Sequence, residues 1–222
     1  KGQPDASITI LVATGLHRPT TQEELLERFG PDIVARERIV VHNAFQPEEM
    51  RYVCQLPSGA GLSVNRLALE SDLIVSEGFI EPHFFAGFSG GRKSILPGIC
   101  SQETVNENHS AKAIASPLAT TGVLQGNPIH EDMAYAARKV GLAFILNVAM
   151  DAEKHIVAAF AGDCIQAHAQ GCAFVSDMCG VDKVTSDIVI TTNSGYPLDQ
   201  NLYQTPKGVS TAAACAGENG VL

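Results

Sequence analysis

The sequence lacks the marks of several well-known structural classes. Its six cysteines include no Cys-x-x-Cys pair, so neither a disulfide framework nor a structural zinc site of the usual spacing is indicated. No apolar stretch approaches the roughly 20 residues that a membrane-spanning helix needs. The 15 lysines and arginines face 24 acidic residues, and the net charge of −9 disfavours a broad nucleic-acid surface. Scattered thiols are typical of a reduced, cytoplasmic protein.

Common catalytic and nucleotide-binding motifs are missing as well. A Walker motif requires lysine directly after its second glycine, whereas this chain has Gly91-Arg92-Lys93-Ser94. The dinucleotide pattern Gly-x-Gly-x-x-Gly does not occur in this glycine-rich stretch, and His-Glu-x-x-His is absent from the chain. The glycine-rich stretch therefore needs another explanation.

The apolar segments predict an α/β fold with a mainly parallel sheet flanked by helices. With 222 residues, 45% of them hydrophobic, the chain is long enough for one large domain and part of a second. Short apolar runs predict strands at 7–13, 38–44, 73–80, 142–150, 155–161 and 187–192. Helical patterns cover 20–30, 131–140, 163–179 and 205–218. Thr20 or Thr21 can cap the first of these helices, with Glu23 and Glu24 as capping-box partners, and Gly30-Pro31 ends it. We place a boundary at 180–182, giving an N-terminal domain of 1–181 and the beginning of a C-terminal α/β domain at 182–222.

The glycine-rich stretch from Glu81 to Lys93 directly follows an expected strand. It combines His83, Arg92 and Lys93 with four glycines, at positions 87, 90, 91 and, just beyond, 98. Glycine lowers the stability of regular elements, so such a run indicates a loop in which the backbone approaches a ligand closely. Ligands of open α/β sheets collect at the carboxyl ends of strands.

Three of the seven histidines, at positions 17, 83 and 109, lie in loops. His17 and His83 each follow an expected strand, and imidazole is the side chain best suited to proton transfer near neutral pH. A lone loop histidine is usually only solvated, so the residues alone leave a shared site and two solvated side chains about equally open. The other four histidines fall within or beside expected strands and helices and are assigned structural or surface roles.

Two lysines also point to ligand chemistry. Lys93 is either a surface or phosphate-binding lysine, or a nucleophile that anchors a group covalently when partly desolvated. Thr205-Pro206-Lys207 fits an N-cap followed by the first two residues of a helix. Free backbone N–H groups and Lys207 would then form a site for a carboxylate or a phosphate.

Taken together, these segments resemble the nickel-dependent lactate racemases over essentially the whole chain. The resemblance rests on four segments in the same order, namely 15–19, 81–98, 108–109 and 195–207. The resemblance implies a site in the cleft between two α/β domains. It also implies a cofactor made of nickel and a pyridinium-3,5-bisthiocarboxylate mononucleotide, which holds the metal in a pincer.

The resemblance further implies a role for each matching residue. Lys93 would carry the cofactor through a thioamide, and His109 would be the protein ligand to nickel, completing a square-planar set. His17 and His83 would be the paired acid and base histidines on opposite faces of the substrate. Tyr203, Gln204 and Lys207 would line the substrate pocket, the last two positioning its carboxylate.

The implied reaction is racemisation or epimerisation of a 2-hydroxy acid, with lactate as the default substrate. One histidine would take the hydroxyl proton while the α-hydrogen moves as hydride to the cofactor, and the return step on the other face would give the other enantiomer. Cofactor-biosynthesis and maturation proteins are the implied partners. An acidic residue and an arginine that the family uses precede the first strand seen here, so we expect this chain to lack that segment.

Two other functions remain open at this stage. A zinc hydrolase could use His17, His83 and His109, although no carboxylate ligand is obvious. A non-catalytic module that binds an anion or carries the cofactor is the other alternative.

Overall fold

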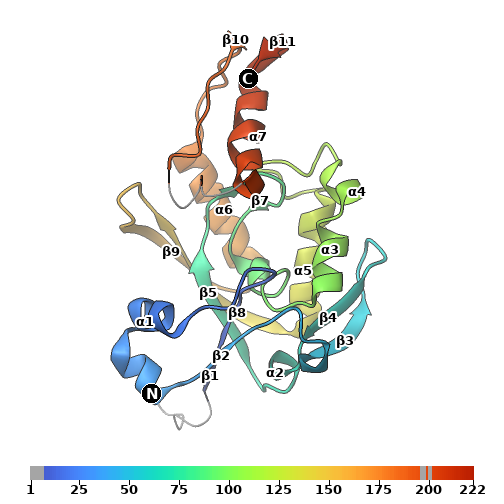
Figure 1. The fold of residues 1–222 in the computed structure, drawn as a ribbon, viewed down its shortest axis with the longest axis vertical. Coiled ribbons are helices and arrows are strands. Elements are labelled where there is room, and N and C mark those ends of the chain that lie inside the picture. Colours follow the sequence, from blue (N-terminus) through green and yellow to red (C-terminus); the bar gives the residue numbers. More distant parts are fainter. Residues whose placement is uncertain (1–7, 196–198, 200–201) are drawn as a thin grey trace.

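The computed structural model describes residues 8–195, 199 and 202–222, and Figure 1 shows their arrangement. The helices are α1 (Gln22–Arg36), α2 (Arg66–Leu69), α3 (Gln102–Asn108), α4 (Ala111–Ile114), α5 (Pro128–Val140), α6 (Gln166–Cys179) and α7 (Thr205–Cys215), with short 3₁₀ turns η2 (Pro47–Glu49), η3 (Gly91–Ser94) and η4 (Leu202–Gln204). The strands are β1 (Thr9–Val12), β2 (Arg38–Val41), β3 (Met50–Gln55), β4 (Gly61–Asn65), β5 (Ile74–Phe79), β6 (Pro82–His83), β7 (Gly87–Phe88), β8 (Leu142–Met150), β9 (Ile156–Gly162), β10 (Ser186–Ile188) and β11 (Ala216–Val221).

The central sheet has the order β5-β8-β9. Strands β5 and β8 are parallel, as are β1 with β2 and β10 with β11. The expected α/β architecture is therefore confirmed, with mixed rather than purely parallel sheets. Strand β9 runs antiparallel to β8 because residues 151–155 form a tight connection, in which Asp151 N–H donates to the His155 carbonyl oxygen at 3.0 Å. A parallel crossover would need about a dozen residues.

The hairpin of β3 and β4 was not predicted from the sequence. Its strands pair antiparallel across residues 50–65, and β3 alternates poorly between exposed and half-buried positions. The inner strand contributes Leu62 and Val64 to the main core, and both side chains are fully buried. The hairpin gives a weak periodic signal, because β3 meets the core only through the partly buried Val53 and Cys54 and does not alternate regularly.

Helix α5 packs the main core against β8. It buries Ile129, Met133, Ala136, Ala137 and Val140, a spacing that forms one continuous helical stripe. The helix begins three residues before the expected start because residue 127, an asparagine, caps it and is followed by proline as the first helical residue. Gly141 ends it in the left-handed conformation, with φ of 84°.

Helix α6 covers the adjoining part of the sheet. Its Cys172 and Val175 pack against Ile80, Phe88 and Ala149, which form a second, smaller core. Two members of this core belong to the glycine-rich segment: Ile80 directly precedes it and Phe88 lies within it. Packing against α6 therefore holds the start and the middle of this segment.

Helix α1 begins as the sequence predicts. Thr21 Oγ1 accepts from Glu24 N–H, and the Glu24 carboxylate accepts from Thr21 N–H, so the expected capping box is confirmed. The helix was expected to end at Gly30-Pro31. Instead Gly30 makes a non-helical kink, with φ of 77° and ψ of 159°, and a second helical segment continues to Arg36. Pro31 is tolerated there because the kink places it at a new helix start.

The C-terminal segment differs from the sequence prediction. Helix α7 ends at Cys215 rather than at position 218, and 216–221 form β11. Gly217 and Gly220 disfavour helix, and β10 offers a parallel partner. Thr205 is the first helical residue rather than the cap, because Gln204 already has helical backbone angles of −83° and −20°. Figure 1 shows α7, β10 and β11 extending beyond the rest of the molecule. The boundary at 180–182 stays a prediction.

Among the described residues, no helix combines the length and the apolar character that crossing a bilayer requires.

The capping box yields a stability prediction. Thr21→Ala removes the acceptor for Glu24 N–H and should lower the free energy of unfolding by about 1 kcal/mol. Thr21→Ser keeps a hydroxyl at the same place and should change it by less than about 0.5 kcal/mol. Urea unfolding followed by circular dichroism measures both variants. Equal losses for alanine and serine would show that the cap is not what stabilises this helix.

Candidate functional site

The glycine-rich loop leaves the carboxyl end of β5 and folds back on itself. Strands β6 and β7 pair antiparallel, with His83 opposite Gly87. Ser89 closes the turn, because its N–H donates to the Glu81 carbonyl oxygen at 2.9 Å and its hydroxyl oxygen accepts from Glu81 N–H at 2.9 Å. The sequence prediction that a ligand-type loop follows this strand agrees with this geometry.

Four side chains from this loop and from the end of α3 gather around Phe85. The ring of His83 meets Phe85 edge-on with centroids 4.5 Å apart, and the ring of His109 does so at 5.0 Å. Lys93 Nζ lies 5.9 Å from the centroid of the same ring. Phe84 stacks on the outer side of His83 at 5.0 Å. The structure thus brings His83, Lys93 and His109 together, which the sequence predicted only through the family resemblance.

His83 is held as a neutral imidazole. Burial lowers its pKa to about 3, and the positive charge of Lys93 adds to this effect. Its Nδ1 accepts from the backbone N–H of Ala86 at 3.2 Å and, more weakly, from that of Phe85 at 3.5 Å. A neutral imidazole whose Nδ1 accepts carries its proton on Nε2. His83 therefore presents an N–H donor to the surroundings of Phe85.

Lys93 is partly desolvated, and the pKa of its amine is lowered. Burial lowers its pKa to about 7 from an ordinary 10.5, Arg92 lowers it further, and the Glu81 carboxylate opposes the shift. A large fraction of the amine is therefore neutral at neutral pH. A neutral amine is nucleophilic, so the surroundings favour the covalent-anchor interpretation of this lysine over the surface one.

His109 has an orphaned nitrogen. It follows α3 as the C-cap residue, and its Nδ1 is buried without a hydrogen-bond partner in the described part of the chain. Burial lowers its pKa to about 4, with Lys93 adding to the effect, so the ring is neutral. Buried polar atoms are nearly always paired, and a neutral imidazole nitrogen is a good ligand for Ni²⁺ or Zn²⁺. The site therefore fits a bound metal or another ligand at this atom.

His17 lies in a turn that contacts the Lys93 segment. Gly15 N–H donates to the Gly98 carbonyl oxygen at 3.0 Å, and Gly98 N–H donates to the Lys93 carbonyl oxygen at 3.1 Å. The His17 side chain is exposed. The backbone thus places this turn beside the loop of Lys93, while the position of the imidazole opposite His83 stays a prediction.

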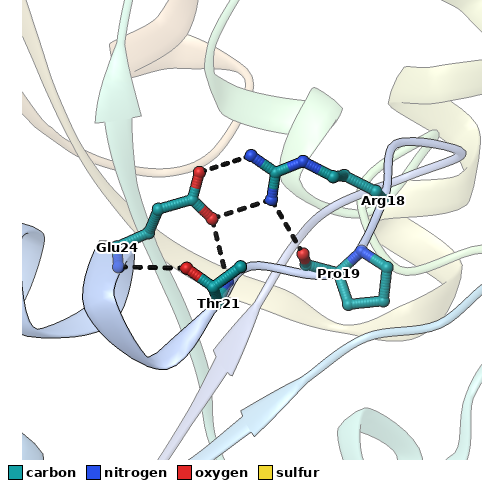
Figure 2. A network of polar contacts seen from close by, with 4 residues as sticks. All are labelled: Arg18, Pro19, Thr21 and Glu24. Carbon is teal, nitrogen blue, oxygen red and sulfur yellow. Dashed lines mark hydrogen bonds and ion pairs between the residues drawn. The ribbon is translucent and has the colours of Figure 1, made fainter.

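Arg18 anchors the far end of the same turn, as Figure 2 shows. Its guanidinium forms two hydrogen bonds to the Glu24 carboxylate, at 2.6 and 2.9 Å, and one to the Pro19 carbonyl oxygen at 3.1 Å. Arg18 foremost lowers the pKa of Glu24 to about 2. The pair ties the turn of His17 to the first turn of α1.

The start of α7 supplies a second group of polar residues. Asn193 bridges it to the preceding strand, because its Nδ2 donates to the Gln204 carbonyl oxygen at 2.8 Å and its Oδ1 accepts from Gly208 N–H at 3.1 Å. Gln204 Oε1 is buried and has no hydrogen-bond partner among the described residues. A cavity of about 240 Å³ opens here, lined by Thr191, Thr192, Asn193, Ser194, Lys207, Gly208 and Thr211.

Lys207 connects this cavity electrostatically to the Phe85 cluster. Its charge contributes to the lowered pKa of His83 and of Lys93, after burial and nearer charges. It also opposes the burial that raises the pKa of Glu81. The expected anion site at this helix start is consistent with the position of Lys207. The side chain of Tyr203 and residues 196–198 and 200–201 lie outside the described residues.

Sequence reasoning missed several members of this site. Phe85 was not singled out, because an aromatic residue beside glycines has no distinctive pattern. Glu81 and Arg92 were treated only as part of the glycine-rich stretch. A three-ligand zinc site finds no support, since no group of three or more histidine, cysteine or acidic side chains in the described ranges could hold a metal ion.

Comparison with known proteins gives consistent matches. Residues 1–122 match the family model of the lactate racemase N-terminal domain, and residues 181–222 match that of the lactate racemase C-terminal domain. Lactate racemase of Thermoanaerobacterium thermosaccharolyticum is 54% identical over 222 residues, which are 100% of this chain and 52% of that protein. Lactate racemase of Lactiplantibacillus plantarum is 54% identical over 219 residues, 99% of this chain and 52% of that protein.

Solved structures show the same likeness. The lactate racemase apoprotein from T. thermosaccharolyticum superimposes with a TM-score of 0.94 at 54% identity, covering 97% of this chain and 52% of that one. A protein of Thermotoga maritima gives a TM-score of 0.68 at 27% identity, covering 82% of this chain and 50% of that one. The chain therefore spans about half the length of the relatives that it matches.

The lowered pKa of Lys93 predicts its reactivity. Acylation of this amine should rise with pH and level off by about pH 8, because the amine is almost fully neutral one unit above a pKa of about 7. The same lysine in urea-unfolded protein is the control, because an amine in water should keep accelerating towards pH 10. Pulse acetylation followed by peptide mass spectrometry gives both profiles. Superimposable profiles would contradict the assignment.

Proposed function

The chain belongs to the lactate racemase family, and we propose that it forms the reacting part of an enzyme that interconverts the enantiomers of a 2-hydroxy acid. Lactate is the first substrate to test, since both curated relatives are named for it. The observation that carries the proposal is the gathering of His83, Lys93 and His109 around Phe85, with one imidazole nitrogen buried and unpartnered.

The residues fit a nickel-pincer nucleotide. The neutral amine of Lys93 is the form that can join a thiocarboxylate through a thioamide. A role for His109 as a metal ligand is supported by its buried Nδ1, which has no hydrogen-bond partner among the described residues. Both side chains contact the same aromatic ring, so a planar group tethered to one is within reach of the other. When bound, this group supplies an acceptor for the α-hydrogen of the substrate as hydride.

His83 handles a proton on one face of the substrate. In the arrangement described, its Nε2 carries the proton and donates, because Nδ1 accepts from Ala86 N–H. To take a proton at Nε2, the ring must first move its own proton to Nδ1 and release that backbone amide. With Nε2 protonated and the ring neutral, His83 can donate a hydrogen bond to the substrate oxygen, but it cannot give that proton away without becoming an imidazolate. Its service as an acid first requires a proton at Nδ1, so the acid and base steps alike depend on a small movement of residues 84–86 that frees Nδ1 from the Ala86 N–H.

His17 is proposed as the acid and base on the other face. Its imidazole is exposed, and its turn contacts the Lys93 segment through Gly15 and Gly98. Two proton-transfer groups are needed because the two enantiomers direct their hydroxyls differently once the carboxylate is fixed. With both histidines present, each direction of the reaction has a base at its start and an acid at its end.

The carboxylate of the substrate is held from the start of α7. Lys207 supplies positive charge, and the unpartnered Gln204 Oε1 belongs to a side-chain amide whose N–H groups can donate to a carboxylate oxygen. These residues orient the substrate, which lowers the entropic part of the barrier. Tyr203 as a further pocket residue, a cytoplasmic location and a need for maturation proteins remain predictions.

Activity and metal binding test the proposal together. Protein isolated from cells that make the cofactor should interconvert D- and L-lactate without added nicotinamide nucleotide. His17→Ala and His83→Ala should each lower kcat by at least about 100-fold and keep nickel, because they remove proton transfer and not a metal ligand. His109→Ala should lose nickel, whereas His155→Ala, on the exposed connection between β8 and β9, should keep both.

The outcomes separate the alternatives. A mass increase on the Lys93 peptide with bound nickel but no racemisation would favour a cofactor-carrying module. Fully active enzyme with an unmodified Lys93 would refute the tether. Zinc in place of nickel, with hydrolytic activity that depends on His17, His83 and His109, would favour the hydrolase.

A further inference from the structure

Arg92, the residue before Lys93, is completely buried, with 0% of its surface exposed. Every hydrogen-bond acceptor found around it in the described residues is neutral. Burying an unpaired charge is among the most unfavourable things a protein can do, so its polar surroundings must compensate. Burial lowers the pKa of this guanidinium to about 10, which still leaves the group charged at neutral pH.

The acceptors are backbone carbonyl oxygens of the glycine-rich loop and the Nδ1 atom of His130, and His168 lies against the same guanidinium. Arg92 Nη1 donates to Phe88 at 2.7 Å and more weakly to Ser89 and Gly90 at 3.3 Å, while Nη2 donates to Ala86 at 2.7 Å. Carbonyls of four residues within 86–90 thus turn inwards to one cation. The loop is wrapped around the guanidinium, which serves as its core in place of an apolar side chain.

The two histidines close the cage from the helices. Arg92 Nε donates to His130 Nδ1 on α5 at 3.1 Å, and His168 Nε2 on α6 lies 3.0 Å from Nη1 and 2.8 Å from the Ser89 carbonyl oxygen. Burial, with Arg92 adding to it, lowers the pKa of His130 to about 4 and that of His168 to about 3. Neutral rings do not repel the guanidinium as charged rings would, and His130 Nδ1 accepts from it. His168 Nε2 donates to the Ser89 carbonyl oxygen when it carries the ring proton, so this ring then holds the loop backbone beside the guanidinium rather than accepting from it.

The backbone of the loop is shaped to allow this wrapping. Gly91 N–H donates to Asn147 Oδ1 on β8 at 2.7 Å. A Cβ atom at Gly91 would lie 2.7 Å from His168 Cδ2, so only glycine lets the loop come this close to α6. The cation, the sheet and the helix therefore all hold the same few residues.

Those residues position the side chains of the candidate site. His83 pairs with Gly87, Phe85 adjoins the Ala86 carbonyl that Arg92 binds, and Lys93 follows Arg92 directly. We propose that Arg92 is a positioning residue: its guanidinium, enclosed by the carbonyls of 86–90, sets where His83, Phe85 and Lys93 lie relative to one another. The positioning itself is independent of the proposed function. Only the chemical roles of His83, Phe85 and Lys93 rest on that proposal.

Nuclear magnetic resonance of the histidine rings tests this directly, in protein without cofactor or substrate. The Phe85 ring displaces the proton resonances of His83 and His109, because both meet it edge-on. In Arg92→Met both sets of resonances should move towards those of unstacked histidine. His42, buried elsewhere with its Nε2 3.0 Å from the Cys100 carbonyl oxygen, should keep its resonances and so report an intact fold.

A matched control and a rescue complete the test. Arg66→Met, at an exposed position at the start of α2, should leave all these resonances unchanged. In Arg92→Ala, guanidinium chloride at tens of millimolar should return the His83 and His109 resonances to their positions in the unchanged protein. Urea or sodium chloride at the same concentration should not. Unchanged His83 and His109 resonances in folded Arg92→Met, or restoration by urea as well, would overturn the proposal.

If Arg92→Met does not fold, Arg92→Lys decides. This variant keeps a cation that can bind some of the carbonyls, so it should fold and keep the His42 resonances in place. Its His83 and His109 resonances should lie between those of the unchanged protein and those of unstacked histidine. An unfolded Arg92→Lys would show a role in the whole fold rather than in positioning, and would overturn the inference. Failure of racemisation would leave these results untouched, so the two proposals fail separately.

Discussion

The site depends on removing positively charged side chains from water within one short stretch of chain. Arg92 stays charged because backbone carbonyls surround it, whereas Lys93 and His83 respond to the same surroundings by losing their protons more easily. One cation held by carbonyls thus helps to keep its neighbours neutral. A neutral amine and neutral imidazoles are the forms that bond to carbon or metal, so the reactivity of the site follows from its desolvation.

Three elements of the fold, β8, α5 and α6, contact the loop and exclude water from it. Strand β8 supplies Asn147, and helices α5 and α6 supply His130 and His168, so the loop after β5 is enclosed by elements that follow it in the sequence. The turn of His17 approaches through Gly15, and α7 brings the charge of Lys207. The candidate site thereby lies at the carboxyl end of β5, and α/β folds usually place their ligand sites at the carboxyl ends of strands.

The sequence predicted local features well and long-range ones poorly. The capping box at Thr21 and the strand at 142–150 follow from patterns a few residues long, and both are confirmed. The buried state of Arg92 depends on partners 38 and 76 residues away, which no local pattern reveals. His168 was therefore taken for an ordinary helix residue. The gathering of His83 and His109 came from family resemblance, since spacing alone left a shared site and solvated side chains equally open.

Residue 127 gives the arrangement a further property. This asparagine accepts from Ile129 N–H at the start of α5, while its Nδ2 donates to the Phe85 carbonyl oxygen at 2.8 Å. The same side chain therefore caps the start of α5, a helix of the main core, and holds the backbone of Phe85, the residue around which His83, Lys93 and His109 gather. Fraying of the first turn of α5 and loosening of the Phe85 backbone are consequently coupled, so the local rigidity of the candidate site depends on the stability of the main core.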